Sequence, residues 1–259
     1  MTRVSIESAR SFVARVELPR APRTRGTALE ASVGLEFDTA RSQSAVVGSE
    51  VISFVTGVTA ERREGIVNSS LLAQLAAKKK VSDPARIYDW YDVYFDVLTN
   101  IGWVVQDKSF AEYHEKSQNF EAHKAILAVA TTLLGAAPTT LALVTTTLNA
   151  LRSMDESSPW ITIFNRESQT SRTARFQISL AQQDPAGQFF VSLMAFGLEA
   201  RSTITQVLFF KAKANEATLR HYSGRVTINT NVLDGVRDAI KAKLLGLADD
   251  YVKALPELG

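Results

Sequence analysis

The feature that most constrains the fold of this chain is a long segment without charge. Residues 125–151 read AILAVATTLLGAAPTTLALVTTTLNAL, twenty-seven residues with no Asp, Glu, Lys or Arg. A segment of that length can span a bilayer as one helix, or it can form two short helices that turn back at residues 135–138. Glycine and proline at its middle, together with seven threonines, favour the helical hairpin.

Each arm of the expected hairpin has one apolar stripe. The stripe residues recur at helical spacing and are Ile126, Val129, Leu133, Leu141, Val144 and Leu148. We expect this stripe to pack in a core. Two alternatives stay open: the hairpin is a surface for self-association, or it inserts conditionally into a membrane.

Composition excludes several function classes. Lys and Arg number 29 against 27 Asp and Glu, and the two signs are interspersed, so we do not expect nucleic-acid binding. The absence of cysteine excludes disulfides, thiol nucleophiles and cysteine-ligated metals. The N-terminus has no apolar block of signal-peptide length, which leaves a cytoplasmic protein or export by a leaderless route.

The N-terminal half predicts a mixture of elements. Alternation predicts strands over 12–18 and 29–37, in a segment over 1–45 that attaches loosely. Residues 48–80 predict a helix with a break near Gly57, and Ser82-Asp83-Pro84 predicts the start of a second helix that ends at Gly102. A strand over 103–105 follows.

The C-terminal half predicts a sheet. The expected strands are 160–164, 175–180, 189–198, 203–210 and 217–228, with turns at 184–187, 213–216 and 223–224. Arg175, Gln177 and Ser179 are expected on a solvent face, and 189–198 is apolar on both faces, which predicts a central strand. A helix is expected from Asn231, with apolar residues at helical spacing as far as Leu255.

These patterns predict an α+β fold. An antiparallel sheet, mainly from residues 160–230, is covered by helices that include the hairpin and the C-terminal helix. We expect one compact domain over residues 1–259.

Few residues suggest a catalytic, metal-binding or ligand-binding site. Asp89, Asp92 and Asp96 share one helical face and are weak candidates for a metal site, although we favour a solvated acidic face as their explanation. The three histidines, His114, His123 and His221, lack the spacing of a zinc motif. Residues 160–167 mix aromatic and polar side chains, which we interpret as a turn cluster, with ligand contacts as the alternative.

The sequence therefore favours a non-catalytic protein without a cofactor. Its expected partner is a protein, either a second copy or another chain. Two alternatives remain: a membrane-active or lipid-binding effector that uses the hairpin, and an enzyme whose site the fold assembles from distant residues.

Overall fold

The computed structural model describes residues 4–20, 37–115, 117–135, 138–184, 186–245 and 247–255. Its helices are α1 (Ile6–Arg15), α2 (Ala60–Lys80), α3 (Ile87–Asn100), α4 (Ala122–Leu134), α5 (Pro138–Ser153), α6 (Pro159–Ser168) and α7 (Thr230–Leu244). Its strands are β1 (Gln43–Val47), β2 (Glu50–Phe54), β3 (Trp103–Val104), β4 (Ala111–Glu112), β5 (Asn119–Glu121), β6 (Thr173–Gln183), β7 (Phe189–Ala200), β8 (Lys211–Lys213), β9 (Ala217–Ile228) and β10 (Val252–Ala254).

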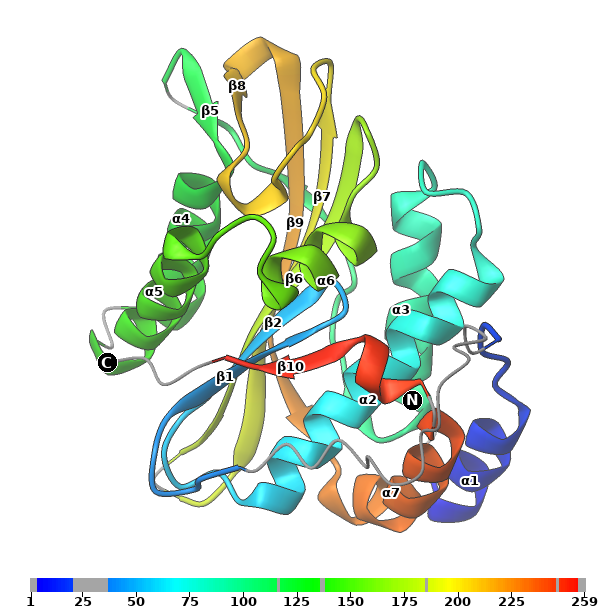
Figure 1. The fold of residues 1–259 in the computed structure, drawn as a ribbon. Helices are drawn as coiled ribbons and strands as arrows, with labels where there is room; N and C mark the ends of the chain where they lie inside the picture. Colours follow the sequence, from blue (N-terminus) through cyan, green and yellow to red (C-terminus); the bar gives the residue numbers. More distant parts are fainter. Residues whose placement is uncertain are drawn as a thin grey trace.

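One mixed sheet organises the molecule (Figure 1). Its strand order is β10-β1-β2-β6-β7-β9-β3, and β4 also pairs with β9. The long strands β6, β7 and β9 form an antiparallel meander. The β1–β2 hairpin joins this meander through a parallel pairing of β2 with β6. Strands β5 and β8 form a separate small antiparallel pair.

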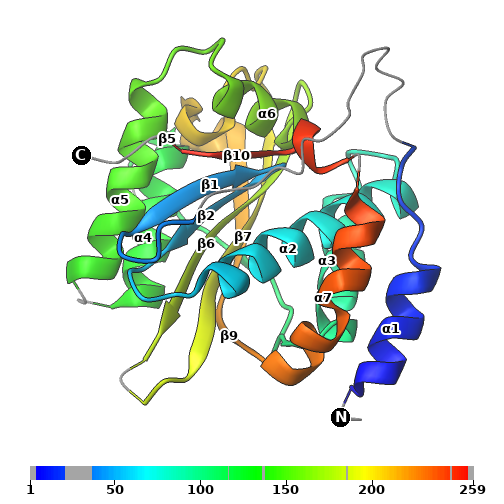
Figure 2. The same cartoon turned by 60° about the horizontal axis from the view of Figure 1, so that its bottom comes forward.

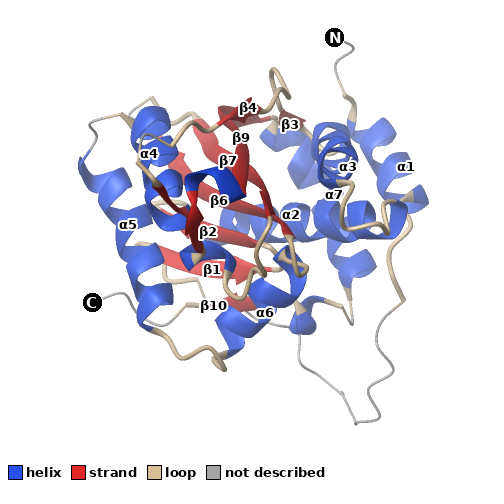
Figure 3. Cartoon of the chain, turned by 90° about the horizontal axis from the view of Figure 1, so that it is seen from above, coloured by secondary structure: helices blue, strands red, loops and turns tan. Residues whose placement is uncertain are grey.

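Helices cover both faces of the sheet, which gives three layers (Figure 2). The hairpin α4–α5 and helix α6 lie on one face, and α2, α3, α7 and α1 lie on the other (Figure 3). Each face has its own apolar core, because successive strand residues point to opposite sides. On β7, Leu193 belongs to the α2–α3 core and Met194 to the hairpin core.

The α+β class is confirmed, with a mostly antiparallel sheet drawn mainly from the C-terminal half. Strand β7 lies between β6 and β9, and its first ten residues are buried, as its doubly apolar pattern predicted. The helical hairpin forms as two helices joined at Gly135, whose φ is +69°. Gly135 thus adopts the left-handed backbone that glycine favours.

Two predictions in the N-terminal half are wrong. Residues 12–18 do not form a strand: helix α1 begins at a capping box in which Ser5 and Ser8 bond each other's backbone N–H. Residues 43–54 form the β1–β2 hairpin in place of a first helical segment, with Gly48 at φ +56° in the turn. The predicted strand over 29–37 lies outside the described residues apart from Phe37.

Helix α2 forms where the second part of the 48–80 pattern placed it, and Lys78, Lys79 and Lys80 occupy its last turn. Helix α3 begins later than predicted, at Ile87, because residues 83–86 form a turn. Gly102 follows the end of α3 with φ +103°, and β3 begins at Trp103, as predicted.

Four predictions in the C-terminal half are wrong. Residues 160–164 belong to helix α6, in which Pro159 takes a first-turn position after Ser158. Residues 207–209 form a 3₁₀ turn instead of a strand. Ser223 and Gly224 lie inside β9, where the missing side chain of Gly224 leaves room for the Tyr222 hydroxyl. Helix α7 ends at Leu244, and the chain then returns to the sheet as β10 beside β1.

The expected solvent face of β6 is a further error. Gln177 and Ser179 are completely buried, and Arg175 is half-buried, because α2 and α3 cover that face. Alternation of polar and apolar residues here marks a buried polar surface rather than a wet one.

Candidate functional site: the helical hairpin and a buried carboxyl group

The predicted hairpin residues divide into two groups. Ile126, Val129, Val144 and Leu148 are at most 4% exposed and pack in the core between the hairpin and the sheet. Leu133 and Leu141 are half-buried at the margin of that core. A partner of the folded protein would therefore meet the outer face of the hairpin, not most of the apolar stripe.

The outer face of the hairpin consists of small uncharged residues. Among the residues of 125–151 whose exposure the structure describes, the exposed ones are Ala128, Thr131, Thr132, Gly135, Thr139, Ala142, Thr146 and Asn149. The hydroxyls of Thr131 and Thr132 donate to the carbonyls four residues earlier, at 2.7 and 3.0 Å. Those hydroxyl donors are already satisfied within the helix, so the outer face is less polar than its threonine content suggests.

Among the described residues, few side-chain hydrogen bonds and ion pairs connect the hairpin to the sheet. The Thr147 hydroxyl lies 2.9 Å from that of Ser44 and 3.3 Å from that of Ser53. At the base of α4, Glu121 pairs with Lys124 and Lys211. Apolar packing accounts for most of the described contact between these helices and the sheet.

A buried carboxyl group lies on the opposite face and was missed from the sequence. Glu50 on β2 is completely buried, and the hydroxyls of Ser70 and Ser179 donate to its two oxygens. The Tyr94 hydroxyl donates at 3.1 Å. Burial raises the pKa of Glu50 above its ordinary value of 4.5, and the hydrogen bonds oppose that rise.

This carboxyl group belongs to a longer hydrogen-bonded chain. Gln74 donates to Ser70 at 3.0 Å and accepts from the Ser49 hydroxyl at 3.1 Å. The single Ser49 O–H is shared with the Gln177 side-chain oxygen, also at 3.1 Å, and Gln177 donates to the Tyr91 hydroxyl at 3.0 Å. The chain joins helices α2 and α3 to strands β2 and β6. No sequence motif marks it, because its members come from four elements.

The other candidate residues from the sequence, the aspartates of α3 and the histidines, do not come together in one site. Asp89 pairs with Arg86 at 2.8 Å, and Asp96 accepts from Asn100 at 3.3 Å. Across the described residues, no three His, Asp or Glu side chains gather as metal ligands would. His123 on α4 and His221 on β9 are half-buried, and burial lowers the pKa of each imidazole.

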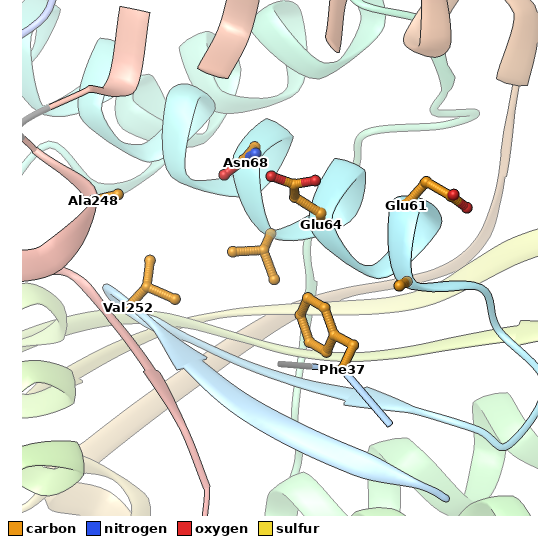
Figure 4. A pocket seen from close by; sticks show the side chains of 8 residues that line it. Phe37, Glu61, Glu64, Asn68, Ala248 and Val252 are labelled. Atoms are coloured by element: carbon orange, nitrogen blue, oxygen red, sulfur yellow. The ribbon is translucent and has the colours of Figure 1, made fainter. Parts of the chain in front are cut away.

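A cavity of about 160 Å³ lies between α2 and β10 (Figure 4). Phe37 and Val252 form its apolar side, and Glu61, Glu64 and Asn68 of α2 line it as well. Glu64 already pairs with Lys241 at 2.8 Å. The lining offers no convergent set of donors, so it suggests no ligand.

Among the described helices, none combines the length and the hydropathy needed to cross a bilayer. No protein-family model matches the sequence, and a comparison with curated proteins finds no match. Among solved structures, the chain is similar to one titled "Structure of the Evf virulence factor", with 12% identity and a TM-score of 0.36 over 86% of this chain and 94% of that one. A delta-endotoxin is similar with 11% identity and a TM-score of 0.34, over 83% and 97% of the two chains. Both TM-scores are too low for either likeness to support an argument.

Proposed function

We propose that this is a non-catalytic protein that acts by self-association, with the outer face of the α4–α5 hairpin as the contact surface. The observation behind the proposal is that this face remains in solvent although it has no charge over residues 125–151. Solvent-facing helix surfaces normally have charged residues opposite the apolar stripe.

A second copy of this chain is a suitable partner for such an uncharged face. Two like surfaces brought together about a twofold axis suffer no charge repulsion, because neither has a charge to repel. Ala128, Thr132 and Ala142 are small, which lets helix backbones approach closely. Threonine hydroxyls that bond within their own helix lose little hydration when they are covered.

The test is absolute mass by light scattering over a hundredfold range of protein concentration. We expect the wild-type protein to exceed its chain mass of 28.4 kDa at high concentration. Ala128→Lys places a charge in the contact and should leave a monomer throughout. Ala14→Lys, the same change at an exposed position of α1 on the far side of the sheet, should behave as wild type. A wild-type monomer at every concentration would overturn the proposal.

A membrane-active role is the second candidate, and the sparse polar attachment of the hairpin favours it. If the hairpin leaves the sheet, the stripe from Ile126 to Leu148 becomes available to lipid. Vesicles of anionic phospholipid should then bind the wild-type protein, and Leu133→Asp should reduce binding in a variant that still folds. Leu245→Asp is the control, since Leu245 is 78% exposed outside the hairpin. Equal binding by both variants would count against insertion of the hairpin.

A further inference from the structure

An unusual arginine lies where α6, β6 and the end of α2 meet. The guanidinium of Arg175 lies over the ring of Trp90, 4.9 Å from its centroid, and its Nε is buried. Among the described residues, this Nε–H has no hydrogen-bond acceptor. A buried N–H without an acceptor is costly, so its presence needs an explanation.

The same molecule shows how it satisfies a buried arginine elsewhere. Arg63 is completely buried on α2, and its guanidinium donates five hydrogen bonds, four to main-chain carbonyls and one to Gln43 at 2.6 Å. The fold therefore supplies acceptors where an arginine is structural. For the Arg175 Nε–H the described residues supply no acceptor, which suggests that the acceptor comes from outside the protein.

Further basic and unpartnered groups surround Arg175. A cavity of about 190 Å³ is lined by Lys78, Arg166, Glu167, Ser168, Gln169 and Arg175, among others. Lys78 and Arg166 both bond the Glu167 carboxylate at 2.7 Å, so three cations face one carboxylate. The buried Ser168 hydroxyl and the Gln169 carbonyl oxygen have no partner among the described residues.

We propose that this cavity binds a phosphate group, either as the free ion or as a small phosphate monoester. The Arg175 Nε–H, the Ser168 hydroxyl and the Lys78 ammonium supply donors to its oxygens. The Gln169 oxygen supplies an acceptor for a protonated phosphate oxygen. Arginine and lysine together are the usual protein partners of phosphate, since charge-assisted hydrogen bonds are the stronger ones. The volume fits a small anion rather than a long chain.

The experiment is a titration with inorganic phosphate, followed by isothermal calorimetry and by thermal unfolding, with sodium chloride used to hold ionic strength constant. The wild-type protein should bind saturably, and its Tm should rise with phosphate because the ligand binds only the folded state. Arg175→Gln should weaken binding by about tenfold or more, the loss expected for one charge-assisted contact. Arg225→Gln, an exposed arginine that stacks 4.5 Å over Phe190 outside the cavity, should bind as wild type.

Two further measurements complete the test. Without phosphate, Arg175→Gln should lose little stability, because the loss of the contact with Trp90 is offset by removal of a buried N–H that has no acceptor. If Arg175→Gln fails to fold, Lys78→Gln at a side chain that is 42% exposed replaces it, with the same expected weakening. A parallel titration with glycerol 3-phosphate distinguishes the sources: tighter binding than inorganic phosphate indicates a monoester, and weaker binding indicates the free ion. Unsaturable binding, or equal binding by the wild-type protein and the cavity variants, would overturn the proposal.

Discussion

Glu50 is the residue whose chemistry depends most on the fold. It is completely buried in the α2–α3 layer, and three hydroxyls, from Ser70, Ser179 and Tyr94, donate to its carboxyl group. Removal of a carboxylate from water costs more than these bonds return, which is why its pKa lies above 4.5. The folded chain therefore holds a proton at Glu50 over a pH range in which the unfolded chain has released it.

That difference predicts a pH dependence of stability. Above pH 4.5 the folded state binds more protons at Glu50 than the unfolded state, so its contribution to the free energy of unfolding falls as pH rises, until pH passes the raised pKa. The slope for one proton is at most about 1.4 kcal/mol per pH unit. Glu50→Gln keeps the shape without the titration, so its stability relative to wild type should increase with pH over this window.

Urea denaturation at a series of pH values measures the difference between the two proteins. Glu61→Gln, which removes an exposed carboxylate from α2, is the control, and the difference between Glu50→Gln and wild type should change more steeply with pH than the difference between this control and wild type. A constant difference between Glu50→Gln and wild type would show that Glu50 titrates alike in both states, contrary to this prediction.

The α4–α5 hairpin is a candidate contact surface, and together with α6 it also covers one face of the sheet. Leu148 on α5 is completely buried against the sheet, whereas Leu141, two turns earlier on the same helix, is half-buried. If the hairpin packs on the sheet in solution, truncation of Leu148 should therefore cost more stability than truncation of Leu141.

The expected loss in the free energy of unfolding is about 3 kcal/mol for Leu148→Ala and about 1 kcal/mol for Leu141→Ala. Urea denaturation monitored by tryptophan fluorescence and by circular dichroism measures both. Equal and negligible losses would mean that the hairpin lies off the sheet in solution, and would strengthen the membrane-active alternative.

The length of an apolar pattern decided whether the sequence predicted the correct type of element. Residues 125–151 and 230–244 have long apolar periods, and both were predicted correctly as helical. Residues 12–18, 48–54 and 160–164 are short apolar runs, for which the periods of helix and strand cannot be separated. The capping signals at Ser5 and at Ser158-Pro159 were available in the sequence and would have corrected two of these assignments.

For the whole molecule, the sequence indicated the class of fold but not its layers. The doubly apolar pattern of β7 predicted a central strand, yet nothing local indicates that β2 pairs in parallel with β6 or that β10 returns to β1. The candidate sites were hidden for the same reason. Glu50, Ser70, Tyr94 and Ser179 come together only when the sheet and two helices are in place, and the neighbours of Arg175 come from three separate elements.

The parallel pairing of β2 with β6 also sets an order of events during synthesis. The β1–β2 hairpin is made before β6, its partner in the sheet, which emerges from the ribosome only after α2 to α6 have been made. Until then both of its edges are open, and pairing across so long a stretch of chain is slow. While residues 55–172 are being made, the nascent chain therefore presents an unprotected β-ribbon over residues 43–54, and a chaperone that shields strand edges would have its target there.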